Sequence, residues 1–117
     1  MKASQLLIKT KWLLDEPDKW SPEFYSFGGK HDLDGALAET DGIEVHKEWM
    51  KIGGSRAYGE ARNYLVDAEK EIWTHLVPDS ALDNLMDYSL DCWEGVTHQD
   101  ITNLLDKAIE NAKADGR

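Results

Sequence analysis

The chain has 117 residues, 41% of them hydrophobic, and a formal net charge of −10 at pH 7. This size fits one domain over residues 1–117, and the acid excess excludes nucleic acid and anionic membranes as direct partners, because both would repel the protein. The single cysteine excludes an internal disulfide and a multi-cysteine metal site. The first residues resemble neither a signal peptide nor a membrane span, so a cytoplasmic protein is expected.

The first expected helix covers residues 4–16. Leu6 and Leu7 form one apolar cluster, and Trp12, Leu13 and Leu14 form a second one at helical spacing. Pro17 closes the segment, because proline cannot continue a helix.

Residues 17–31 are predicted to form an aromatic-rich loop with two prolines and a Gly-Gly pair. Its aromatic side chains are expected to cover part of the core, and they are the second candidate binding surface: Trp20, Phe24, Tyr25 and Phe27. A pocket lined by Trp20, Tyr25, His31 and Trp49 would instead make the loop at 20–31 a small-ligand or enzymatic site.

A short helix is predicted over 33–40, with Gly42 in the C-cap role. The preceding "HDLD" at 31–34 offers three possible metal ligands in four residues, but we expect a solvated turn without a metal. Residues 43–54 fit either a short strand or an irregular segment.

A long helix is predicted over 56–76, because apolar residues recur there every three or four positions. Gly59 weakens this pattern by roughly 1 kcal/mol relative to alanine, and Pro78 ends it. A further short helix at 80–87 begins with Ser80 and Asp83 in a capping-box arrangement.

The last helix, at 98–114, carries the strongest signals. Thr97 and Asp100 form a capping box, and an apolar face follows: Ile101, Leu104, Leu105, Ala108, Ile109 and Ala112. Trp93 is expected to plug the base of this helix, with its indole N–H bonded to a carbonyl. Together the elements predict a mainly α fold, a compact bundle of three principal helices with short helices and an aromatic-rich loop.

No catalytic residue is expected. The four histidines, His31, His46, His75 and His98, lack the spacing of metal ligands. Cys92 follows Asp91 directly, and a neighbouring carboxylate disfavours a reactive thiolate. No cofactor is expected either.

The window from Glu71 to Asp106 contains eight acids and no lysine or arginine. Four of the acids are spaced by four residues and would form one stripe on a continuous helix. With Glu94 they make the first candidate partner-binding surface: Asp79, Asp83, Asp87, Asp91 and Glu94. The alternative is a solvated face that keeps the protein soluble.

The stretch 57–114 resembles an uncharacterised family of small bacterial and phage proteins. The matching pieces are "AYGEARNYL", "DCWEGVTHQDI" and "LLDKAIENA", and "DLDGAL" at 32–37 is similar to a helix start of that family. This sequence departs from the family's Trp-Asn-Asp motif, because Glu94 and Gly95 follow Trp93. The resemblance implies a mainly helical fold and a phage or bacterial origin, and it carries no activity.

The expected function is that of a small acidic binding module, encoded by a phage or mobile element. It would inhibit a host protein, such as a nucleic-acid-binding defence complex, by occupying its basic surface. Two alternatives remain: the ligand or enzymatic site at 20–31, and an assembly subunit in which exposed aromatics make a homo-oligomer. The protein is expected to be a monomer or a homodimer.

Overall fold

In the computed structural model, the described residues are 2–21, 26–27, 30–41, 56–82, 90–91 and 93–117. They form helices α1 (Ala3–Leu13), α2 (Leu33–Thr40), α4 (Arg56–Ile72) and α5 (His98–Ala114), with a 3-10 helix η1 (Pro17–Lys19). Strands β1 (Ser26–Phe27) and β2 (Lys30–His31) pair antiparallel. The predicted mainly helical fold is therefore confirmed, and the radius of gyration of 12.9 Å is that of a compact chain.

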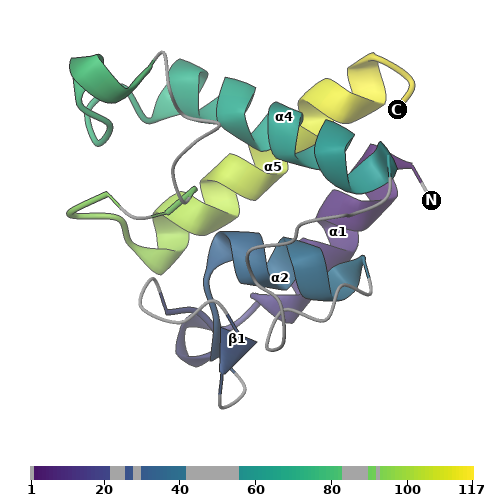
Figure 1. Cartoon of the computed structure of the whole chain (residues 1–117), viewed down its shortest axis with the longest axis horizontal. Coiled ribbons are helices and arrows are strands. Elements are labelled where there is room, and N and C mark those ends of the chain that lie inside the picture. Colours follow the sequence, from purple (N-terminus) through teal and green to yellow (C-terminus); the bar gives the residue numbers. More distant parts are fainter. Residues whose placement is uncertain (1, 22–25, 28–29, 42–55, 83–89, 92) are drawn as a thin grey trace.

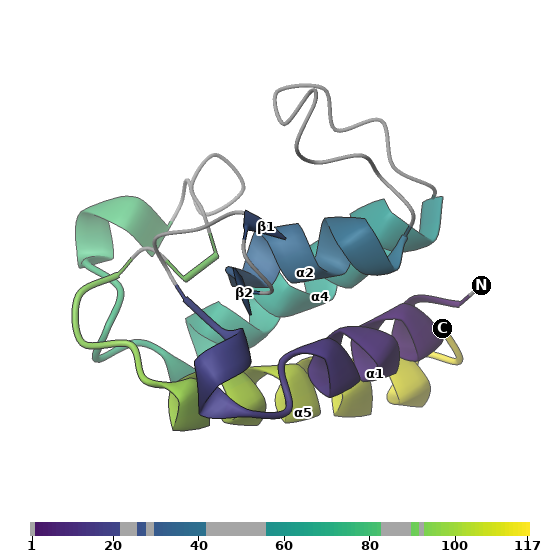
Figure 2. The ribbon, with the colours of Figure 1, turned by 90° about the horizontal axis from the view of Figure 1, so that it is seen from below.

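Helices α1 and α5 lie side by side and run antiparallel, with the two chain termini at the same end (Figures 1 and 2). Three contacts along the pair fix this arrangement. The Ser4 hydroxyl donates to the Arg117 carbonyl at 3.1 Å, Lys11 pairs with Asp106, and His98 Nε2 donates to the Leu14 carbonyl at 2.6 Å. Helix α4 packs across α5, and α2 packs against α1.

The core lies between these four helices. The largest fully buried apolar side chains are Leu6, Leu7, Leu14, Leu33, Leu37, Leu65, Trp73, Leu90, Ile101, Leu104 and Leu105. The predicted burial of Ile101 and Leu105 is confirmed, whereas Ile109 is only partly buried.

The caps of the helices follow the sequence signals. At the start of α5, the Asp100 N–H donates to Thr97 Oγ1 at 3.2 Å and the Thr97 N–H donates to Asp100 Oδ2 at 2.9 Å. At the start of α2, Asp32 accepts from the Gly35 N–H at 2.6 Å. These bonds satisfy amide groups that a helix leaves without intrahelical partners.

Two helix ends differ from the predicted ones. Helix α1 ends at Leu13 instead of residue 16, and Glu16 is extended, which is the conformation that a following proline imposes. Helix α4 ends at Ile72 instead of residue 76, because the chain turns at Trp73 and buries Trp73 and Val77. The ends predicted for α2 and α5 are confirmed.

Trp12 departs from the predicted apolar face of the first helix. Its side chain is 66% exposed, because α1 buries the opposite stripe of Ala3, Leu6, Leu7 and Thr10. A surface groove of about 570 Å³ beside it is lined by Gln5, Ile8, Lys9 and Trp12.

Several predictions fall on residues outside the described ones. They concern Gly42, residues 43–54 and most of the helix at 80–87, of which the described residues 79–82 form a 3-10 turn. Within the described ranges, no helix is both long and apolar enough to cross a membrane.

Candidate functional site

The predicted acidic stripe is only partly a surface feature. Asp79 and Glu94 are exposed. Asp91 is 1% exposed, so its expected place on an exposed stripe was wrong. The chain turns at Leu90 and Asp91 instead of continuing a helix, and this turn is docked in the interior. Asp83 and Asp87 lie outside the described residues.

The aromatic loop has a structural contact at its start. Trp20 is half-buried, and its indole N–H donates to Asp91 Oδ2 at 2.7 Å. His31, which was placed in the alternative ligand pocket, is buried and pairs through Nδ1 with Glu39 Oε2 at 3.1 Å. Phe24, Tyr25, Trp49 and the side chain of Phe27 lie outside the described part of the chain.

The most unusual feature of the described interior is a group of four buried acids, here named the carboxyl cluster: Asp32, Asp34, Glu69 and Asp91. Asp32 and Asp34 are each 6% exposed and Glu69 is 0% exposed. The expectation of a solvated acidic turn at 31–34 was therefore wrong. These residues start α2, and the first turn of α2 is buried against the rest of the fold.

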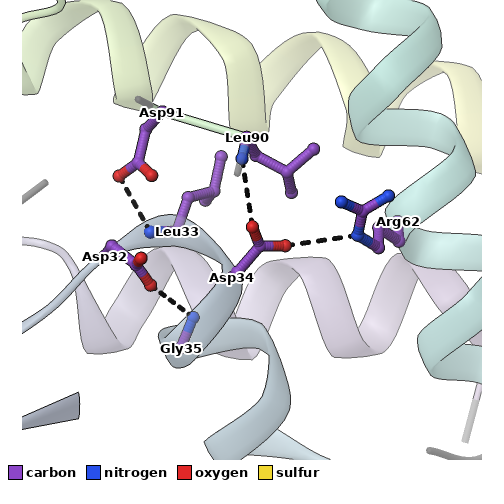
Figure 3. A network of polar contacts seen from close by, with 7 residues as sticks. All are labelled: Asp32, Leu33, Asp34, Gly35, Arg62, Leu90 and Asp91. Carbon is purple, nitrogen blue, oxygen red and sulfur yellow. Dashed lines mark hydrogen bonds and ion pairs between the residues drawn. The ribbon is translucent and has the colours of Figure 1, made fainter. Parts of the chain in front are cut away.

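Two members of the carboxyl cluster join distant segments by reciprocal hydrogen bonds (Figure 3). Asp34 Oδ2 accepts from the Leu90 N–H at 3.0 Å, and Asp91 Oδ2 accepts from the Leu33 N–H at 2.9 Å. Each carboxyl group thus satisfies a buried amide of the other segment. These bonds hold the turn at Leu90 and Asp91 against the start of α2.

A guanidinium group from α4 compensates part of this charge. Arg62 Nε lies 3.3 Å from Asp34 Oδ1, and both side chains are largely buried. Burial raises the pKa of Asp34, while Arg62 and the Leu90 N–H oppose that rise. Burial likewise raises the pKa of Asp91 to about 6, against the hydrogen bonds from Trp20 and Leu33.

The pKa values of the other two members of the cluster are raised as well. Burial first, and then the charge of Asp91, raises the pKa of Asp32 to about 8. Burial first, and then the charges of Asp34 and Asp91, raises the pKa of Glu69 to about 9. Both carboxyl groups therefore favour the protonated form more than a solvated acid does.

Glu69 differs from the other members because neither of its oxygens has a hydrogen bond of ordinary geometry within the described residues. The charge of Arg62, and then the Trp93 side chain, oppose the rise in its pKa, so Trp93 faces this carboxyl group. The bond from its indole to a backbone carbonyl stays a prediction. Trp93 packs against the core and is partly buried, in keeping with the plug that the sequence predicted.

The chemistry open to the carboxyl cluster is proton binding. Among the described residues, no group of three histidine, cysteine, aspartate or glutamate side chains has the arrangement of a metal site. Asp32, Asp34 and Asp91 direct oxygens at backbone N–H groups instead.

One member of the cluster had a signal in the sequence. Leu65, Glu69 and Trp73 are spaced by four residues, so Glu69 lies on the apolar face of a helix, where an acid is rarely found without a reason. Asp34 and Asp91 had no such signal, because their pairing joins segments far apart in the chain.

No family model, curated protein or solved structure matches this chain. The resemblance to small bacterial and phage proteins therefore stays a prediction from the motifs alone.

Proposed function

We propose that this protein is a small acidic binding module that occupies the basic, nucleic-acid-binding surface of a host protein and thereby inhibits it. Its binding face would include Asp79 and Glu94. We further propose a phage or mobile-element origin, in line with the resemblance of its sequence motifs.

The observation that carries this proposal is the sign of the exposed charge between residues 71 and 106. Glu71, Asp79 and Glu94 are exposed there, and the window holds no lysine or arginine. Ordinary protein surfaces mix both signs, which keeps them soluble without a strong field. A one-sign surface accelerates association with a basic partner and repels nucleic acid.

The structure also narrows the set of residues suited to this role. Asp91 does not belong to the proposed surface, because its side chain is buried and accepts hydrogen bonds from Trp20 and Leu33. Asp106 is paired with Lys11, and Asp100 caps α5. Asp79 and Glu94 remain as exposed acids of this window.

The test is affinity capture from bacterial lysate with the wild-type protein and a variant carrying Asp79→Lys and Glu94→Lys. A control variant, Asp18→Lys with Asp67→Lys, makes the same change in net charge on other exposed positions. We expect a captured partner that is basic, is released by DNA and is lost from the first variant only. Equal loss of the partner from both variants would mean that binding depends on net charge alone and not on these two positions.

Salt gives a second measure of the same interface. Binding should weaken at least tenfold between about 50 and 500 mM salt, as the screening length falls to a few ångströms. Capture that resists both salt and DNA would contradict the proposal.

The exposed Trp12 supports a second candidate function, that of a homo-oligomer subunit. An indole exposed by 66% beside a groove is the kind of aromatic contact that self-association buries. Sedimentation of the wild type and of Trp12→Ser tests it. A concentration-dependent dimer that Trp12→Ser abolishes would favour this function.

A further inference from the structure

We propose that the carboxyl cluster is a proton-dependent clasp, in which a proton on Glu69 keeps the turn at Leu90 and Asp91 docked on α2, and loss of that proton releases it. This inference does not depend on the proposed binding function. It rests on the position of one fully buried acid, whose oxygens have no hydrogen bond of ordinary geometry within the described residues, beside two acids that hold the fold together.

The closed clasp is defined by three hydrogen bonds to two carboxyl groups. Asp34 binds the Leu90 N–H, and Asp91 binds the Leu33 N–H and the Trp20 indole at 3.0, 2.9 and 2.7 Å. The bonds to Leu90 and Leu33 join α2 to the turn (Figure 3), and the bond from Trp20 joins the turn to the segment that follows η1. Carboxylates accept such bonds best when ionised, so these bonds oppose the rise that burial causes in the pKa values of Asp34 and Asp91.

The charges that act on Glu69 come from three elements. Asp34 of α2 and Asp91 of the turn disfavour its ionisation, and Arg62 of its own helix favours it. Arg62 already lies 3.3 Å from Asp34. An ionised Glu69 would therefore place a third negative charge beside a single shared guanidinium in a buried site, which is strongly unfavourable.

Glu69 has two ways to remain buried, and the structure favours one of them. It can share a cation with its neighbours, or it can keep a proton. Within the described ranges no three ligand side chains converge as a metal site, and the neighbouring oxygens are aimed at N–H groups. The proton is therefore the group that balances the charge.

Ionisation of Asp32 does not open the clasp. Asp32 is the N-cap of α2 and accepts from the Gly35 N–H at 2.6 Å, and a charged carboxylate strengthens both this bond and its interaction with the helix dipole. The two titrations are therefore separable, because Gly35 reports Asp32 and the clasp amides report Glu69. His31 precedes Asp32 in the chain and pairs with Glu39 at 3.1 Å.

The experiment is an NMR titration of the wild type, Glu69→Gln and Glu71→Gln from pH 6 to 10. In the wild type, the backbone 15N resonances of Leu33 and Leu90 and the indole resonance of Trp20 should shift together with a midpoint near pH 9. Glu69→Gln should abolish this shift, and the exposed control Glu71→Gln should keep it. The Gly35 resonance should titrate alike in all three proteins.

Four results would overturn the clasp. They are no wild-type transition up to pH 10, the same transition in Glu69→Gln, loss of the Leu105 amide signal at the same pH, or a changed midpoint on addition of magnesium or calcium chloride. The third would mean global unfolding and the fourth a cation site. If Glu69→Gln fails to fold, the 13C resonance of the wild-type Glu69 carboxyl decides, because its midpoint must equal that of the clasp amides.

Discussion

Asp34 and Asp91 each accept a hydrogen bond from the backbone beside the other, at 3.0 Å from Leu90 and 2.9 Å from Leu33. The exchange joins the start of α2 to a turn more than fifty residues further along the chain. A turn that lacks regular structure is thereby fixed in the interior by side-chain acceptors, since buried amides left without a partner are costly.

Asp91→Ala should destabilise the protein far more than Asp91→Asn. Alanine leaves the Leu33 N–H and the Trp20 indole N–H without an acceptor. Each buried donor left without a partner costs about 1–3 kcal/mol of stability. Asparagine keeps one oxygen in place and removes a buried charge. Urea denaturation at pH 7 measures both variants, and equal losses would show that the acceptor oxygen is not what holds the turn.

Much of the helical frame could be predicted from the sequence because its signals are local. Thr97, Asp100 and the apolar repeat behind them define α5 within one helix, and its predicted ends are those observed. The end of α4 was missed because Leu76 continued the helical row, whereas burial of Trp73 turns the chain four residues earlier. Tertiary packing decided that end, and no local pattern contains it.

Glu69→Gln should stabilise the protein in a manner that depends on pH. The unfolded chain releases the Glu69 proton near its ordinary pKa of 4.5, while the folded protein keeps it up to a pKa of about 9. The wild type therefore loses stability as the pH rises between these values, and glutamine does not titrate. We expect a gain of about 1–3 kcal/mol at pH 8 that vanishes at pH 4.

Urea denaturation at both pH values checks this prediction, with Glu71→Gln as the exposed control. A gain of equal size at pH 4 and pH 8 would assign the effect to packing and not to the proton. A loss at pH 8 would mean that the ionised Glu69 has a favourable partner.

The carboxyl cluster was harder to predict than the helices. Its members Asp32 and Asp34 stand in a short acidic run that has the composition of a solvated loop, yet 6% of each is exposed. Asp32 accepts its hydrogen bond from Gly35 in its own helix, whereas the burial of Asp34 is offset by Leu90 and Arg62, and that pairing depends on the fold. The position of Glu69 on an apolar helix face was the one signal that the sequence offered.

Two glycine substitutions should have opposite effects. Gly59 is exposed within α4, and a Cβ there would meet no heavy atom within 4 Å, so Gly59→Ala should add about 0.5–1 kcal/mol. Gly95 has φ +89°, so Gly95→Ala should cost about 1–2 kcal/mol through backbone strain, even though the nearest atom, on Leu76, is at 3.6 Å. Thermal unfolding of both variants tests the pair, and a gain at Gly95 would contradict the described turn.

Leu105→Ala should be among the most damaging truncations in α5. The Leu105 side chain is 1% exposed within the core shared by α1, α4 and α5, so its removal leaves a cavity that the tightly packed helices cannot fill. The expected loss is about 2–5 kcal/mol. Ile109→Ala, one turn later on the same face, removes a partly buried side chain and should lose about 1–2 kcal/mol. Urea denaturation with an unchanged m-value gives both numbers. If the order were reversed, the face of α5 that packs against the core would be assigned wrongly.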